Sequence, residues 1–243
     1  MSRPDPEAIK KRYEYVKQRI SYACTQAGRG VDEITLVAVS KTFSESYIRV
    51  LYDLGHRDFG ENKVQELVSK SESFQYQPHY GEINWHMIGH LQRNKTREVI
   101  DIPCLFHGLD SLRLAKELDK RAEQAKIRQP CLVQVNISGE ETKYGVAPED
   151  LHPFLSTASG FENLIIKGLM GMASPSADAE SVRPQLRDLR ELSATYSGPL
   201  EDDWSMEFLS MGMTQDYEVA IEEGATHLRL GSAIFGERTY TTQ

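Results

Sequence analysis

The chain has 243 residues, of which 40% are hydrophobic, and a formal net charge of −8. This length and hydrophobic content are sufficient for one large domain with a substantial core. A net negative charge without a block of lysines and arginines argues against a protein that coats nucleic acid or anionic lipid, because both require a concentrated cationic surface. No apolar run approaches the roughly 18 residues of a membrane span, and the first residues lack the apolar segment of a signal peptide. We therefore expect a cytoplasmic protein without a membrane or nucleic-acid partner.

The hydrophobic pattern between residues 34 and 236 alternates between short apolar runs and longer stretches with apolar residues three and four apart. Such alternation is typical of βα units. The runs that we interpret as strands are residues 34–41, 57–62, 83–89, 104–110, 130–138, 164–172, 207–213 and 227–236. Eight strands alternating with eight helices predict a (β/α)8 barrel, an α/β fold that forms a single domain over residues 1–243. A doubly wound open sheet is the alternative.

Two helices have well-marked ends. The stretch from Ser44 places Ile48 and Leu51 on one face and ends at Gly55, and the stretch from Thr214 ends in the same way at Gly224. Glycine ends helices because it readily adopts positive φ.

Three further segments lie outside the repeating units. Residues 5–28 predict an extra amphipathic helix ahead of the first strand, and residues 71–82 and 174–181 are interpreted as loops.

Chemistry in a barrel belongs at the carboxyl ends of the strands, where the βα loops converge. Lys41 shares a face with Val37 and Val39 and stands at the end of the first predicted strand. Partial burial there favours the neutral amine, which attacks an aldehyde to form a Schiff base. The alternative is an ordinary solvated lysine.

The fifth predicted strand alternates valine and isoleucine with Gln134, Asn136 and Ser138. Three polar residues on a buried face predict a polar barrel interior in which each polar group finds a partner. Contact with a ligand and an internal layer of hydrogen bonds explain this pattern equally well.

The last two predicted strands carry glycine and serine at their ends, as Ser210, Gly212, Gly231 and Ser232. The loops after strands seven and eight of such barrels often bind phosphate. Backbone N–H groups at glycines and serine hydroxyls supply suitable donors. The pattern therefore favours a phosphate site, although the glycines could serve only to permit tight turns.

Arg229 is flanked by leucines in the last predicted strand, so its buried guanidinium requires an acceptor. Glu61, Asp110 or a ligand atom could provide one.

Several motifs are incomplete. His86 and His90 have the spacing of a helical zinc pair, but the segment between them is interpreted as a strand, so we expect no metal. The dinucleotide-binding and phosphate-loop fingerprints are absent, and Ser210 lacks the glycine of a nucleophile elbow.

The sequence is similar to the YggS/PROSC family of pyridoxal 5′-phosphate (PLP) homeostasis proteins. The similarity is carried by VAVSKT (37–42), FGENKVQE (59–66), WHMIGHLQRNK (85–95), VNISGEETKYG (135–145), GLMGMA (168–173) and LSMGMTQDYEVAIEEGATHLRLGSAIFG (209–236). Six motifs in order over nearly the whole chain make the resemblance specific.

The resemblance implies a fold-type III barrel, like the N-terminal domain of alanine racemase, that holds PLP as an aldimine on Lys41. The other cofactor-binding residues that it implies are Ser210, Gly231 and Ser232 at the phosphate, Arg229 at the pyridine nitrogen, and Asn62 and Met211 near the ring. Gly212 is also expected among the cofactor-binding residues.

The family is understood as a carrier and regulator of the PLP pool, so we expect a non-catalytic monomer that binds PLP and serves PLP-dependent apoenzymes. The short segments around the predicted barrel leave no second domain to place an acid or base opposite Lys41. Arg229 would also keep the pyridine nitrogen unprotonated and so weaken the electron sink. Two alternatives stay open, a PLP-dependent amino-acid racemase of low activity and an aldolase-like barrel that uses Lys41 without a cofactor. A role of Lys143 in PLP entry or exit is a further hypothesis.

Overall fold

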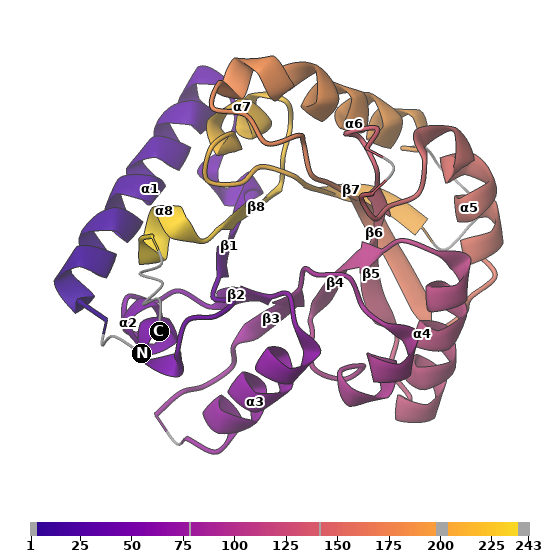
Figure 1. The fold of residues 1–243 in the computed structure, drawn as a ribbon, viewed down its shortest axis with the longest axis horizontal. Coiled ribbons are helices and arrows are strands. Elements are labelled where there is room, and N and C mark those ends of the chain that lie inside the picture. Colours follow the sequence, from indigo (N-terminus) through magenta and orange to yellow (C-terminus); the bar gives the residue numbers. More distant parts are fainter. Residues whose placement is uncertain (1–3, 78, 141, 198–203, 238–243) are drawn as a thin grey trace.

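The structure is a computed structural model that describes residues 4–77, 79–140, 142–197 and 204–237. Eight parallel strands pair in chain order and close into a barrel (Figure 1). They are β1 (Thr35–Val39), β2 (Asp58–Glu61), β3 (Asn84–Met87), β4 (Leu105–Leu109), β5 (Gln129–Val135), β6 (Leu164–Gly171), β7 (Trp204–Ser210) and β8 (His227–Leu230). The pairing of β1 with β8 completes the ring. The predicted (β/α)8 barrel is confirmed, and the open sheet is wrong.

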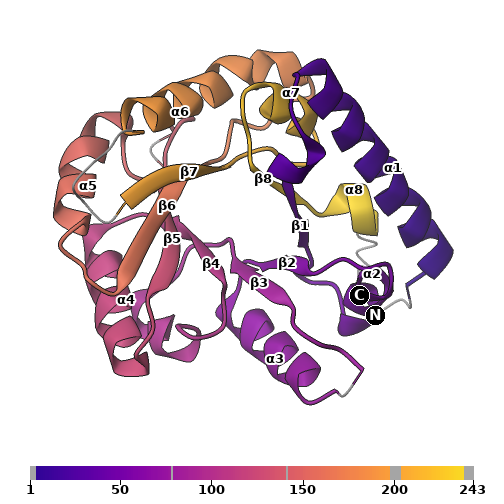
Figure 2. The same ribbon diagram turned by 180° about the vertical axis from the view of Figure 1, so that it is seen from behind.

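Helices surround the barrel on its outside, as the two opposite views in Figures 1 and 2 show. They are α1 (Pro6–Gln26), α2 (Glu45–Asp53), α3 (Val64–Gln75), α4 (Leu112–Ala125), α5 (Leu151–Ala158), α6 (Arg183–Thr195), α7 (Tyr217–Glu222) and α8 (Ser232–Phe235). Four short 3₁₀ helices are η1 (Val31–Glu33), η2 (Arg93–Glu98), η3 (Pro148–Asp150) and η4 (Ala179–Val182). Across these described ranges, no helix is long and apolar enough to cross a membrane.

The extra N-terminal helix forms as predicted and packs against α2, α7 and α8. Asp5 caps it by accepting a hydrogen bond from the backbone of Ala8, and Pro6 occupies its first turn, where a missing N–H costs nothing. The Arg12 guanidinium donates to the carbonyl oxygens of Ile234 and Phe235. The helix therefore holds the last helix of the chain in place.

The predicted helix ends at Gly55 and Gly224 are confirmed, because both glycines have positive φ directly after α2 and α7. Other boundaries differ from the prediction. The crossover after β3 contains only the 3₁₀ helix η2. Residues 71–75 of the predicted loop 71–82 form the last turn of α3, and the end of the loop 174–181 enters η4.

Most strands end before the predicted residue, and two of these differences concern predicted polar residues. β8 ends at Leu230, and Ser232 already begins α8, because a serine after a glycine starts a helix as readily as it continues a strand. β5 ends at Val135, so Asn136 and Ser138 lie in the following loop and hydrogen-bond to each other. Only Gln134 of the expected polar face lies inside the strand, where it is buried.

Most of the buried apolar residues form one core between the outer surface of the barrel and the helices. A separate small cluster contains Leu105, Leu132 and Met170, on β4, β5 and β6. The remaining buried polar side chains include His86, His107, Gln134, Ser210 and Arg229. A polar barrel interior was predicted correctly, but most of the residues that make it polar come from strands other than β5.

Gly168 is the position where the barrel tolerates least change. Its φ is +150°, and a Cβ there would lie 1.8 Å from the carbonyl oxygen of Phe208 on β7. We expect Gly168→Ala to lower the free energy of unfolding by about 3 kcal/mol or more, because strands β6 and β7 would have to separate. Urea denaturation measures this loss. Gly160→Ala is the control, since its Cβ would lie 3.4 Å from its nearest neighbour; equal losses in the two variants would contradict the prediction.

Candidate functional site

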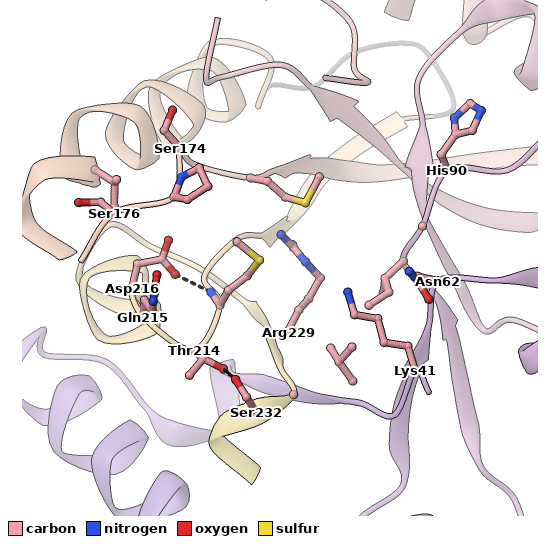
Figure 3. Close-up of a pocket in the computed structure, with 18 of the residues that line it drawn as sticks. Lys41, Asn62, His90, Ser174, Ser176, Thr214, Gln215, Asp216, Arg229 and Ser232 are labelled. Atoms are coloured by element: carbon pink, nitrogen blue, oxygen red, sulfur yellow. Dashed lines mark hydrogen bonds between the residues drawn. The ribbon is translucent and has the colours of Figure 1, made fainter. Parts of the chain in front are cut away.

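A cavity of about 880 Å³ opens at the carboxyl ends of the strands. This volume is in the range of small-molecule and cofactor sites. The predicted residues that line it are Lys41, Asn62, Arg229, Gly231 and Ser232. Figure 3 shows Lys41 and Arg229 extending into the same space, with Thr214 and Ser232 beside them. The structure therefore brings five predicted residues, from β8 and from the segments that follow β1, β2 and β8, to one place.

Lys41 lies in the turn after β1 rather than within the strand, because β1 ends at Val39. The next residue, Thr42, has a φ of 67°, a conformation that is costly for a β-branched side chain. Its backbone N–H donates to Oε2 of Glu66 at 2.6 Å. This bond from α3 stabilises the turn that presents Lys41 to the cavity.

A buried ion-pair network also stabilises the turn that carries Lys41. Lys70 on α3 donates to the carbonyl oxygen of Ser40 at 2.9 Å, to Glu61 Oε1 at 2.7 Å and to Glu66 Oε2 at 3.1 Å. The Ser40 hydroxyl donates to the same Glu61 oxygen at 2.6 Å. Burial raises the pKa of Glu61, and Lys70 and Ser40 oppose this shift. An ammonium with three acceptors is fully satisfied, so the network fixes the backbone on the amino side of Lys41.

Arg229 reaches the cavity from β8, where it pairs in register with Val37 of β1. Its guanidinium donates to the Ser210 hydroxyl at 2.6 Å and to the Gly171 carbonyl oxygen at 2.9 Å. Burial lowers its pKa to about 10, so it stays protonated near neutral pH.

The two carboxylates proposed as acceptors for Arg229 bind elsewhere. Glu61 accepts from Lys70, and Asp110 accepts a hydrogen bond from His90. The two carboxylate alternatives are therefore wrong, because a serine hydroxyl and a backbone carbonyl accept from the guanidinium instead.

Ser210, Met211 and Gly212 are not among the residues that line the cavity. Ser210 and Met211 are fully buried, and the Ser210 hydroxyl contacts Arg229 and His107. Gly212 has a φ of +93°, and its carbonyl oxygen accepts from the Arg229 backbone. These three residues thus shape the wall behind Arg229.

Thr214 occupies the cavity wall after β7, although it was not among the predicted cofactor-binding residues. Its hydroxyl accepts from the Ser232 hydroxyl at 3.2 Å and from the Ala233 backbone at 3.4 Å (Figure 3). Asp216 accepts from the backbone of Met213 at 2.6 Å and so closes the loop that carries Thr214. The only sequence signal was a hydroxyl residue in the same βα loop as Ser210.

The cavity wall includes a polar atom without a protein partner. Oδ1 of Asn62 is buried, and no donor in the described part of the chain reaches it. Such an atom costs free energy unless a ligand or water satisfies it. The amine of Lys41, the guanidinium of Arg229 and the hydroxyls of Thr214 and Ser232 lie in the same wall. These groups fit a small anionic ligand that carries a carbonyl and ring heteroatoms, as PLP does.

Another part of the cavity wall is aromatic. The ring of His90 stacks on Tyr144, with 3.9 Å between centroids, and His90 donates a 2.7 Å hydrogen bond to Asp110. Lys143 lies beside Tyr144 and pairs with Glu140 at 2.6 Å. No group of three or more potential metal ligands is found in the part of the chain that the structure describes.

The chain matches the profile of the alanine racemase N-terminal domain over residues 5–239. It is 42% identical over 229 residues to the pyridoxal phosphate homeostasis protein of Aquifex aeolicus, covering 94% of this chain and 98% of that protein. The protein of the same name from Escherichia coli K12 is 39% identical over 226 residues, covering 93% and 95%.

Solved structures show the same relationship. PipY of Synechococcus elongatus with PLP bound is 30% identical and superposes with a TM-score of 0.75, covering 91% of this chain and all of that one. Alanine racemase of Clostridium difficile is 12% identical with a TM-score of 0.70, and the match covers 97% of this chain and 57% of the racemase. At that identity the racemase shows the shared fold alone.

Changes in the free energy of unfolding test the role of the ion-pair network around Lys70. We expect Lys70→Met to lower the free energy of unfolding by about 3 to 5 kcal/mol, because Glu61 would remain buried without its partner. Adding Glu61→Gln should recover part of the loss. Lys167→Met is the control, since it removes an exposed pair with Glu207 that contributes about 1 kcal/mol or less. A double variant no more stable than Lys70→Met would contradict this account of the network.

Proposed function

The chain belongs to the pyridoxal phosphate homeostasis protein family and has its alanine racemase N-terminal fold, and from this premise we propose that it is a PLP-binding protein of vitamin B6 homeostasis. The observation that carries the proposal is the joint presence of Lys41 and Arg229 in one cavity beside the unsatisfied oxygen of Asn62. Few small metabolites require an amine, a guanidinium and hydroxyl donors together.

In this proposal the Lys41 amine bonds to the aldehyde carbon of PLP as a Schiff base, with loss of one water. The Ser40–Thr42 turn, held by Lys70 and Glu66, fixes where the amine meets its ligand. Arg229 donates to the pyridine nitrogen, and Asn62 lies near the ring. A preorganised amine reacts readily because little conformational freedom is lost on bonding.

The phosphate is proposed to bind at Thr214, Gly231 and Ser232. The two hydroxyls lie 3.2 Å apart on the cavity wall, and Gly231 joins β8 to α8. Hydroxyl and backbone donors are the usual ligands of phosphate in barrels. Ser210 lies behind the cavity wall, and its hydroxyl accepts from Arg229. Met211 and Gly212 lie behind the same wall.

We propose that the protein holds and releases PLP without turnover. Bound PLP supplies an aldehyde and an electron-withdrawing ring. Because Arg229 stays protonated, it acts as a donor to the ring nitrogen and keeps that nitrogen from carrying a proton. The names of the relatives support a role in PLP supply. The shared racemase fold keeps a low racemase activity as the second candidate. A cytoplasmic monomer that serves PLP-dependent apoenzymes completes the proposal.

Borohydride reduction tests the covalent bond. We expect the reduced protein to carry a pyridoxyl group on Lys41, located by peptide mass spectrometry. Lys41→Ala should still bind PLP, more weakly and without the visible Schiff-base band, since charge-assisted hydrogen bonds contribute about 1.5 to 3 kcal/mol each. Lys63→Ala, an exposed lysine after β2, serves as the control and should retain the adduct. An adduct on Lys63 or Lys143 in the unmodified protein would overturn the assignment.

A comparison of PLP with pyridoxal, which lacks the phosphate, tests the proposed phosphate site. Thr214→Val with Ser232→Ala should weaken PLP by about tenfold or more, because two hydroxyl donors are lost, and should leave pyridoxal nearly unchanged. Equilibrium dialysis of PLP and pyridoxal measures both affinities. Ser176→Ala, at another edge of the cavity, is the control. If the two affinities fell by the same factor, the phosphate would bind at strands other than β7 and β8.

A further inference from the structure

A line of hydrogen-bonded side chains runs through the barrel interior and ends at Arg229. Its members come from five strands: Asp58 on β2, His86 on β3, His107 on β4, Ser210 on β7 and Arg229 on β8. The separations are 3.2 Å from Asp58 to His86, 3.0 Å from His86 to His107, 2.9 Å from His107 to Ser210 and 2.6 Å from Ser210 to Arg229. None of the first four residues lines the cavity. The line therefore connects the cofactor site to a part of the barrel that the cofactor does not touch.

The partners at the two ends give the line a direction. A guanidinium only donates, so Arg229 donates to Ser210, and a carboxylate only accepts, so Nε2 of His86 donates to Asp58. With neutral imidazoles, Nδ1 of His86 then accepts from Nε2 of His107, and Nδ1 of His107 accepts from the Ser210 hydroxyl. In this arrangement every bond points from Arg229 toward Asp58, and each of the three residues between them both donates and accepts.

Burial keeps the surroundings of the line uncharged. It lowers the pKa of His107 well below its ordinary value, with smaller contributions from Arg229 and the neighbouring imidazoles, and it lowers that of His227 to about 3. The Cys104 thiol, 3.7 Å from His86, has a pKa raised to about 12 by burial. The His227 imidazole and the Cys104 thiol, which lie beside the line, are therefore neutral near pH 7.

The line ends in a charge on the face of the barrel opposite the cavity. Asp58 is the first residue of β2, and it also accepts from the Asn84 side chain at 3.1 Å. Burial raises the pKa of Asp58, but the hydrogen bonds from His86 and Asn84 outweigh it and the net shift is downward. A carboxylate and a guanidinium thus stand at opposite ends of one hydrogen-bonded line.

We propose that Asp58, His86, His107 and Ser210 are positioning residues that hold Arg229 in place and thereby set the strength of its hydrogen bond to the ring nitrogen of PLP; the inference rests on the proposed function. Hydrogen bonds in a chain polarise one another, so the carboxylate makes each acceptor stronger in turn, up to the Ser210 oxygen. The bonds to Ser210 and Gly171 fix the plane of the guanidinium. Its remaining donors then keep one direction toward the cavity.

The direction of the line can be measured without any cofactor. Nitrogen-15 NMR of the unloaded protein near neutral pH should show His107 as a neutral ring protonated at Nε2, with a proton on Nε2 of His86, which faces Asp58. A proton on Nδ1 of His107 would reverse the bond to Ser210 and overturn the proposed arrangement.

The role of the line at the ring nitrogen is tested with two ligands, PLP and its 1-deaza analogue, in which a C–H group replaces that nitrogen. Asp58→Asn keeps the shape of the side chain and removes its charge. We expect it to weaken PLP by about threefold to tenfold and the analogue by less than about twofold. Ser210→Ala should have the same selective effect, because it removes the acceptor that Arg229 contacts.

Two controls separate the line from general stability. Asp119→Asn changes another partly buried aspartate that accepts from an asparagine, Asn163, but contacts no part of the line, and it should change neither affinity. In the Ser210→Ala protein, Asp58→Asn should have no further effect, since the connection to Arg229 is already broken. Additive effects of the two changes, or equal effects on both ligands, would overturn the proposal.

The experiment also distinguishes this inference from the proposed function. If the unmodified protein bound neither ligand, the PLP function itself would fail, and the role at the ring nitrogen with it. If it bound both ligands and Asp58→Asn left their affinity ratio unchanged, only the inference would fail.

Discussion

The buried ammonium of Lys70 is the interaction on which the site depends. It accommodates two glutamates and one carbonyl oxygen around the turn that carries Lys41, and its position on α3 links that turn to the second βα unit. Without Lys70, Glu61 would be a buried charge without a cationic partner. Glu66, which accepts from the strained backbone at Thr42, would also lose its ion pair with Lys70. A buried ion pair of this kind adds little net stability but strongly favours one arrangement. Here that arrangement places an amine at the mouth of the barrel.

The barrel could be predicted because each βα unit carries local signals. Helix periodicity, the glycines at Gly55 and Gly224 and the apolar runs are all readable within about ten residues of sequence. The end of β8 and the missing α-helix after β3 could not be read in this way. Both depend on how strands meet across the barrel, which tertiary packing decides. The family resemblance was confirmed by the relatives that match nearly the whole chain.

The candidate site was predictable where a strand end alone decides position, as for Lys41, Arg229 and Ser232. It was not predictable where rotation of the chain decides which side chain reaches the cavity. Ser210 and Thr214 are four residues apart in one segment, and only the structure shows that Thr214 lines the cavity and Ser210 lies behind it. The line from Asp58 to Arg229 joins five strands, and no sequence spacing reports such contacts.

The seam between β1 and β8 has a consequence for biosynthesis. The cavity wall takes residues from Val39 to Glu237, so it needs both ends of the barrel, and Arg12 of α1 fastens the last helix of the chain. While a ribosome is still making the later strands, β1 has an open edge that waits for a partner encoded almost a whole chain length away. The nascent protein therefore has no complete site to fill, and it exposes an unpaired parallel strand that invites aggregation until synthesis ends. A ligand can fill the complete site only after β8 and α8 have been synthesised.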